Sequence, residues 1–102
     1  MGDENNIILV GEKSFMAYVT GVVMQFTTLN SDEVIIKARG KFIAKAVDIA
    51  EVARKRFLEN KVSVDKVLIN SEDFTNKEGK QIRVSTIEIY MGSVENIRVP
   101  KP

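Results

Sequence analysis

The order of extended and helical runs constrains the fold of this chain more than any other feature of its sequence. An extended apolar run followed by an amphipathic helical pattern occurs twice, and two more extended runs then follow each other directly. In chain order, these runs cover residues 7–10, 14–28, 33–39, 41–58, 64–74 and 81–91. Two strand–helix units predict parallel strands joined by right-handed crossovers, and a closing hairpin adds antiparallel strands. We therefore expect a two-layer α/β (α+β) domain of βαβαββ order, with a mixed four-stranded sheet covered by two helices.

The apolar positions predict which faces these elements bury. The run at 7–10 is continuous and β-branched, which is typical of a buried strand. Ser14 is a good N-cap for the first helix, and Gln25 falls on the face opposite its apolar residues. The apolar face of this helix should consist of Phe15, Tyr18, Val19, Val22, Val23 and Phe26. The apolar stripe of the second helix should consist of Ile43, Ala46, Val47, Ala50, Ala53 and Phe57.

The last extended run changes its apolar face part-way along. Two apolar residues near its start share one face and three near its end share the other: Ile82 and Val84, then Ile87, Ile89 and Met91. A strand packed on one core keeps one apolar face. We therefore expect the hairpin tip, roughly residues 73–84, to project beyond the core as an arm, with a bulge or twist near Ser85. An extra core layer from a partner subunit is the alternative. Asn and Gly within 75–80 fit a short hairpin turn.

Length and composition exclude several classes of function. A chain of 102 residues is expected to form one domain, with residues 1–6 as a loose start and 92–102 as a tail. The chain has no Cys and no His, which excludes disulfides, thiolate or imidazole metal sites and His-dependent catalysis. Polar residues interrupt the charge-free stretch at 14–31, so it makes a poor membrane span. We expect no enzyme activity, no metal, no cofactor and no membrane partner.

The charged residues are unevenly distributed along the chain. The formal net charge is only +1. Residues 1–36 carry a net charge of −4, residues 37–61 carry +5, and residues 62–102 are neutral. This concentration of basic side chains in one quarter of the chain predicts a polyanionic partner for that quarter.

Four cations lie in or near the second strand-to-helix turn. Period two places Lys37 and Arg39 on the same side of the strand, and Gly40 allows the backbone to turn sharply. Lys41 opens the helix, where the helix dipole disfavours a cation, and Lys45 follows one turn later on the same face. A phosphate bound at the helix amides would offset that cost. An ordinary solvated charged face is the alternative.

Two further segments carry cations that suit phosphate contacts. The first strand-to-helix turn, at 11–14, holds Lys13 but lacks the glycines of a P-loop, so Lys13 is either a single phosphate contact or a solvated lysine. The hairpin carries Lys77, Lys80 and Arg83. A basic two-stranded ribbon can enter a DNA groove, although exposed hairpin lysines also serve solubility and edge protection.

One more basic cluster has a structural explanation. Arg54, Lys55 and Arg56 come late in the second helix, where the helix dipole favours cations. Glu51 lies four residues before Lys55, which is the spacing of a helical ion pair. We interpret this cluster as helix capping.

Two segments resemble the Alba family of small archaeal chromatin proteins. The first is Val34-Ile35-Ile36-Lys37-Ala38-Arg39-Gly40-Lys41, followed by Ile43 and Lys45-Ala46-Val47-Asp48, which looks like the family's central signature. The second is Arg83-Val84-Ser85-Thr86-Ile87-Glu88-Ile89, which is similar to its last strand. The resemblance covers the chain from about Ile7 to Tyr90. It implies the βαβαββ fold, a homodimer with two hairpin arms, and non-catalytic binding of double-stranded DNA and often RNA.

The resemblance also implies roles for individual residues. Five cations match the nucleic-acid-contacting positions of the family: Lys13, Lys37, Arg39, Lys41 and Lys45. Phe57 matches an apolar position used between neighbouring dimers on DNA. Family members often carry Gly-Lys-Lys-Pro, whose first Lys is acetylated to weaken DNA binding, but Glu12 occupies that position here. The acetylation switch is therefore not carried over to this chain.

These observations together predict a dimeric protein of the cytoplasm that associates with an archaeal chromosome. It would hold double-stranded DNA with its basic strand-turn-helix segments and hairpin arms. An RNA-binding protein that uses the same surface is the first alternative, because RNA presents the same phosphates. A protein-interaction adaptor that uses the uncharged face of the first helix is the second.

Overall fold

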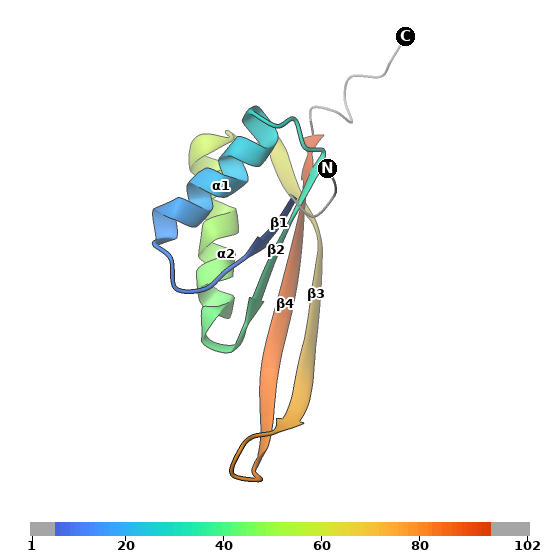
Figure 1. Cartoon of the computed structure of the whole chain (residues 1–102). Coiled ribbons are helices and arrows are strands. Elements are labelled where there is room, and N and C mark those ends of the chain that lie inside the picture. Colours follow the sequence, from blue (N-terminus) through green and yellow to red (C-terminus); the bar gives the residue numbers. More distant parts are fainter. Residues whose placement is uncertain (1–5, 95–102) are drawn as a thin grey trace.

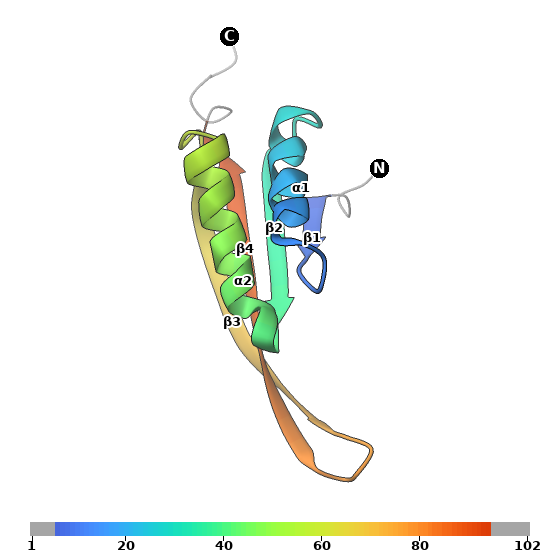
Figure 2. The ribbon, with the colours of Figure 1, turned by 90° about the vertical axis from the view of Figure 1, so that its left-hand side faces the viewer.

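A computed structural model describes residues 6–94 and confirms the expected architecture, a mixed four-stranded sheet with two helices (Figure 1). The elements are β1 (Ile7–Leu9), α1 (Phe15–Thr27), β2 (Glu33–Arg39), α2 (Ile43–Val52), β3 (Val62–Thr75) and β4 (Gln81–Ser93). The strand order is β1-β2-β4-β3, where β1 and β2 are parallel and the two other pairs are antiparallel. Both helices lie on the same side of the sheet, so the domain has two layers (Figures 1 and 2).

Helix α1 forms where its sequence predicts it, with one difference on its polar face. The Ser14 side chain accepts a hydrogen bond from the Ala17 amide at 3.2 Å, which confirms Ser14 as the N-cap. Gln25, expected on the outer face, is buried, and its side-chain oxygen accepts a 2.6 Å hydrogen bond from the Ser31 hydroxyl. This bond satisfies the buried amide oxygen. No helix within residues 6–94 is long and apolar enough to cross a membrane.

Helix α2 is the central part of one continuous helical segment, residues 40–57, which contains three types of helical turn. A 3₁₀ turn at Gly40–Phe42 leads into α2, and a π-helical turn at Ala53–Phe57 follows it. The expected apolar stripe is partly wrong. Val47 and Phe57 are exposed, whereas Ile49 is fully buried. Ile49 lies three residues after Ala46 and four before Ala53, so the buried stripe runs through these residues and leaves Val47 outside. Phe57 lies in the wider π turn, which a strict 3.6-residue period does not anticipate.

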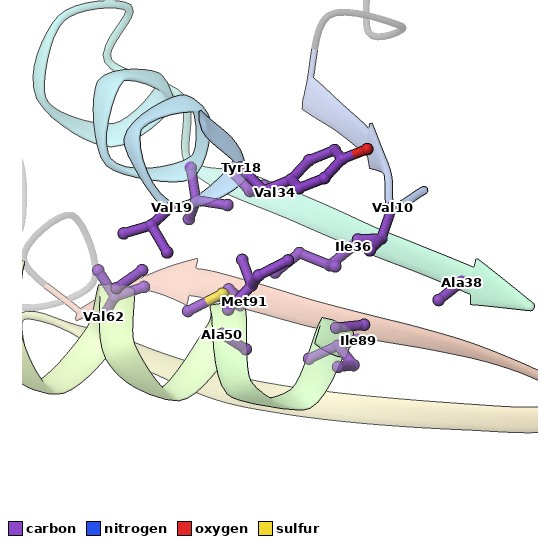
Figure 3. Packing of buried hydrophobic residues seen from close by; sticks show 14 of the residues in the cluster. Val10, Tyr18, Val19, Val34, Ile36, Ala38, Ala50, Val62, Ile89 and Met91 are labelled. Carbon is purple, nitrogen blue, oxygen red and sulfur yellow. The ribbon is translucent and has the colours of Figure 1, made fainter. Parts of the chain in front are cut away.

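The core lies between the helices and the helix-facing side of the sheet. Its fully buried large side chains include Ile36 of β2, Met91 of β4 and Ile49 of α2, and many of its members are shown in Figure 3. The expectation of a buried first strand is wrong, because β1 is an edge strand whose Leu9 is 69% exposed. Only Val10, just after β1, is fully part of the core.

The β3–β4 hairpin extends beyond the helices and the other strands as an arm, as expected (Figures 1 and 2). Its strands pair continuously from Lys66 opposite Tyr90 to Thr75 opposite Gln81. The one register shift of this pair lies between Val64 and Lys66, far from Ser85, so of the bulge or twist expected near Ser85 no bulge is present. The hairpin twists along its length and remains paired at Ser85. Because the pairing is unbroken, Ile82 and Val84 lie on the sheet face opposite the one that carries Ile87 and Ile89 to the core.

The limits expected for the termini are only partly testable. Strand β4 continues through Gly92 and Ser93, so these two residues belong to the sheet and not to a tail. The amide of Val94 still donates to the Lys61 carbonyl at 2.9 Å. The remaining expected terminal segments, 1–5 and 95–102, lie outside the described residues.

Candidate nucleic-acid interface

A groove of about 700 Å³ lies where the arm leaves the body of the domain. Its walls come from the ends of β1 and β2, the turn into α2, and the base of the arm. Three of the expected cations line it, namely Lys37, Arg39 and Lys41. Two aromatic side chains, Phe42 and Phe74, line it as well. The structure therefore brings the strand-turn-helix cations together beside the arm.

The backbone at the β2–α2 turn leaves helix amides open beside these cations. Gly40 has φ +53°, a left-handed conformation that favours glycine. Neither the 3₁₀ turn nor α2 has a side-chain N-cap hydrogen bond. The first amides of a helix lack intrahelical partners and attract anions. Arg39 and Lys41 flank this position, so one phosphate oxygen can meet amides and a cation at once.

Each of the three groove cations is paired with a carboxylate. Lys37 lies 3.7 Å from Glu88, Arg39 lies 3.2 Å from Glu72, and Lys41 lies 3.7 Å from Glu12. The cationic side chains are 38%, 58% and 78% exposed, respectively. Exposed ion pairs of this kind contribute about 0–1 kcal/mol and exchange readily. A phosphate can therefore replace these carboxylates at little cost in protein stability.

The sequence did not reveal two of these carboxylates, Glu88 and Glu72, as part of the site. Glu88 of β4 lies directly opposite Lys37 of β2, because β4 lies between β2 and β3 in the sheet. Strands β2 and β4 are far apart in the sequence. Glu72 reaches Arg39 from β3, across the intervening strand β4. Only the strand order and register bring these groups together. The pairing of β3 with β4 in the hairpin does not by itself show that these carboxylates lie beside Lys37 and Arg39.

Lys45 and Lys13 belong to one local network. The Lys45 ammonium donates to the carbonyl oxygens of Gly11 and Lys13, at 2.7 Å each. It also lies 5.1 Å from the centre of the Tyr18 ring, whose hydroxyl accepts from the Gly11 and Lys13 amides. Lys45 thus holds the β1–α1 turn against α2 and presents the exposed Lys13 side chain. The nucleic-acid contacts of both lysines stay predictions.

The cations of the arm lie away from the groove. Arg83 pairs with Asp73, directly opposite on β3, at 3.0 Å. Lys77 and Lys80 lie in the turn at the tip, where the Asn76 side chain accepts from the Glu78 and Lys80 amides at 2.9 Å. Gly79 adopts φ +82° there, as the turn requires. Across residues 6–94, no ion pair involves Lys77 or Lys80, so both ammonium groups are available to an anion.

The basic cluster near the end of the helical segment has the structural role expected of it. Glu51 pairs with Lys55 at 3.2 Å, and Arg54 forms a two-pronged contact with the same carboxylate. Arg54 also donates to the Asn60 side chain at 3.2 Å. The hydrogen bond from Arg54 lowers the pKa of the Glu51 carboxyl below its ordinary value. Phe57, in the π turn, is 50% exposed, so a contact with a neighbouring molecule is sterically open to it.

Comparison with known proteins identifies the family. The Alba family model matches residues 6–71. A protein of Methanococcus maripaludis named "DNA/RNA-binding protein Alba" is 44% identical over 85% of this chain and 97% of its own length. A protein of the same name from Methanocella arvoryzae is 47% identical over 86% and 90%, respectively. The solved structure of Alba from Thermoplasma volcanium has a TM-score of 0.77 and 42% identity, covering 85% of this chain and 99% of its own. This chain therefore belongs to the Alba family.

Proposed function

We propose that this protein is a non-enzymatic, dimeric binder of double-stranded DNA that contributes to the organisation of an archaeal chromosome. The observation that carries the proposal is the convergence of Lys37, Arg39 and Lys41 on one groove beside uncapped helix amides. The names of the relatives, "DNA/RNA-binding protein Alba", support a nucleic-acid ligand. The protein would act in the cytoplasm, where it would associate with the chromosome.

The proposed mechanism is an exchange of carboxylates for phosphates. In the free protein, Glu88, Glu72 and Glu12 neutralise the groove cations. A DNA backbone entering the groove offers phosphates to the same cations and to the amides of the 3₁₀ turn, Gly40–Phe42, that leads into α2. Each engaged phosphate releases condensed counterions, which drives binding independently of sequence. The arm then follows the duplex, with Lys77 and Lys80 at its tip and Arg83 along its side.

An apolar patch on the helix side of the sheet supports the proposed homodimer. Val64, Val67 and Ile69 of β3 lie opposite the buried residues of β4 and are 38%, 48% and 78% exposed. Helix α2 lies on this side of the sheet (Figure 2), and its Val47 is also exposed. Strand β3 is in addition an edge strand of the sheet. A second copy covering this patch would bury apolar surface and place two arms on one assembly.

RNA is the second candidate ligand, because the names of the relatives include it. The groove cations contact phosphates, which RNA and DNA share, so the same side chains would serve both. The two duplexes differ in groove shape, and an arm that inserts into the minor groove would distinguish them.

The proposal is tested by titrating the full-length protein with a duplex DNA and a duplex RNA of the same sequence and length. Fluorescence anisotropy of a labelled strand measures each affinity at one fixed salt concentration. We expect tighter binding of the DNA duplex. Equal or tighter binding of the RNA duplex would favour the second candidate, and no binding to either would refute a nucleic-acid function.

A further inference from the structure

The sheet face opposite the helices is uncovered and carries its own pattern of side chains. Within residues 6–94, neither helix packs over it (Figure 1). The strand registers place its side chains in rows across the sheet. One row is Ile7, Ile35, Tyr90 and Lys66, and the next is Leu9, Lys37, Glu88 and Leu68. We call these two rows the open face.

Tyr90 is held in place at the centre of the open face. Its hydroxyl donates a 2.8 Å hydrogen bond to one oxygen of Glu88, and the other oxygen lies 3.7 Å from the Lys37 ammonium. The Lys66 ammonium lies 4.5 Å from the centre of the Tyr90 ring. The hydrogen bond to Glu88 raises the pKa of the Tyr90 hydroxyl above its ordinary value, so the ring stays neutral. One aromatic ring is thus oriented between two cations.

The surroundings of Tyr90 suit an unpaired base better than a duplex. Leu9 and Leu68 are 69% and 45% exposed. They are the two end residues of the adjacent row, with Lys37 and Glu88 between them. Aromatic rings on a sheet bind nucleic acids by stacking with bases, and neighbouring cations bind the linking phosphates. A duplex keeps its bases stacked on one another, so only a single strand can offer a base to a ring on a flat sheet.

The open face is continuous with the groove. Lys37 belongs to both, and Arg39 occupies the next row along β2. Rows on one face are two residues apart, which is roughly 7 Å. The cations Lys66, Lys37 and Arg39 therefore mark a path from β3 across the sheet into the groove. A flexible strand that enters the groove can continue along this path, whereas a straight duplex leaves it.

We propose that the open face is a second binding surface, specific for single-stranded nucleic acid, in which one base stacks on Tyr90 and the flanking phosphates contact Lys66 and Lys37. The proposal rests on the proposed function because the two surfaces share Lys37. Glu88 acts as a positioning residue that orients both Tyr90 and Lys37. A stacking base would displace the Lys66 ammonium from the ring and leave it free to pair with a phosphate.

The test compares a 12-nucleotide single strand with a 20-base-pair duplex, each bound by the full-length protein and by Tyr90→Leu and Tyr90→Phe variants. We expect Tyr90→Leu to weaken single-strand binding roughly 5- to 100-fold, because the stacking platform is lost. Its duplex affinity should stay within about twofold. Tyr90→Phe keeps the ring and should retain most of the single-strand affinity. Met24→Ala, which removes an exposed apolar side chain from α1, is the matched control and should change neither affinity.

The outcomes separate this inference from the proposed function. Wild-type protein that binds the duplex but no single strand would overturn the inference and leave the proposed function standing. An equal loss for both ligands in Tyr90→Leu, with an unchanged thermal midpoint, would also overturn it. No binding to either ligand would refute the proposed function itself. Running the single strand as RNA and as DNA identifies which of the two the open face prefers.

Photocrosslinking gives a readout that does not depend on any variant folding. A single strand carrying 5-iodouridine is irradiated in complex with the wild-type protein, which is then digested with trypsin. Tryptic cleavage after Arg83 and Arg98 yields the peptide 84–98, which contains Tyr90. We expect the adduct on Tyr90 in this peptide. Adducts confined to other peptides, in a complex that is fully formed, would contradict the proposal.

Discussion

At the scale of single residues, the main finding is that opposite charges neutralise each other across the groove. Lys41 and Glu12 lie 3.7 Å apart, and both side chains are about four-fifths exposed, at 78% and 82%. The attraction between two such groups in water is small, so the pair gives little stability. The same carboxylate competes directly with a phosphate for the ammonium group. We therefore expect Glu12 to affect nucleic-acid binding more than folding.

Reversing the charge of a groove cation should abolish nucleic-acid binding and leave the fold intact. We expect Arg39→Glu and Lys41→Glu each to weaken duplex binding at least tenfold, because each removes a phosphate contact and adds a repulsive carboxylate. The thermal midpoint, followed by circular dichroism, should change by no more than a few degrees. Arg56→Glu, the same charge change at an exposed helix residue, is the control. Unchanged affinity in both groove variants would remove this segment from the interface.

Replacing Glu12 should strengthen binding to DNA of any sequence. Glu12→Gln removes the competitor of Lys41, whereas Glu12→Lys also adds a cation at the β1–α1 turn. We expect affinity to rise in the order wild type, Glu12→Gln, Glu12→Lys. The dependence of affinity on salt should steepen by up to about one unit for each newly engaged phosphate. If Glu12→Lys binds no more tightly than Glu12→Gln, then the turn does not face the nucleic acid.

At the scale of secondary-structure elements, the sequence predicts regular segments well and irregular ones poorly. The bounds of β2 and the N-cap of α1 follow from local patterns, because alternation and capping are local effects. The stripe of α2 was misjudged because it included Val47 in place of Ile49, and because the π turn at Ala53–Phe57 breaks the period at Phe57. The register shift at Val64/Lys66 was not anticipated, since a single sequence does not specify which strand of a pair carries the extra residue.

The candidate site was likewise predictable only where its residues lie close together in the sequence. Clustering of Lys37, Arg39 and Lys41 followed from their proximity in sequence. The carboxylates that pair with them come from β3 and β4, and their positions depend on long-range strand pairing. The role of Lys45 in fastening the β1–α1 turn likewise depends on how α2 packs beside that turn. Non-local contacts of this kind have no signature in a short window of sequence.

The arm is expected to contribute to binding and not to folding. Deleting residues 75–80 and closing the shortened hairpin with Asn-Gly removes Lys77 and Lys80 but leaves every core side chain in place. We expect a folded protein with a near-native circular dichroism spectrum that binds duplex DNA several-fold more weakly. A variant with the original turn and only Lys77→Gln and Lys80→Gln separates loss of charge from loss of reach. Unfolding on deletion would instead place the tip in a structural core.

At the scale of the whole molecule, the domain is elongated and its surfaces divide by chemistry. Its principal extents are 59 × 27 × 24 Å, and the arm provides much of the long dimension. Cations and their carboxylates line the groove at the base of the arm, and the apolar patch of β3 and α2 lies on the helix side. The net charge of +1 leaves no strong overall attraction for DNA. We therefore expect DNA binding to depend on the local groups and, in the proposed dimer, on two arms in one assembly.

The apolar patch should be responsible for dimerisation. We expect the wild-type protein to show twice the chain mass of 11.4 kDa by light scattering, and Ile69→Glu to shift it towards the monomer. A carboxylate at this position would be buried unpaired in the interface, which is costly. Met24→Glu places the same charge on the exposed side of α1 and should leave the mass unchanged. A dimeric Ile69→Glu protein would show that the subunits associate through another surface.

The salt dependence of duplex binding tests the central claim, that groove cations exchange carboxylates for phosphates, most directly. Affinity of the wild-type protein for a 20-base-pair duplex is measured by anisotropy at a series of potassium chloride concentrations. If a dimer engages roughly four to six phosphates, log affinity should fall against log salt with a slope of about −4 to −5. A slope near zero would contradict the mechanism, because binding that releases no counterions does not depend on phosphate contacts.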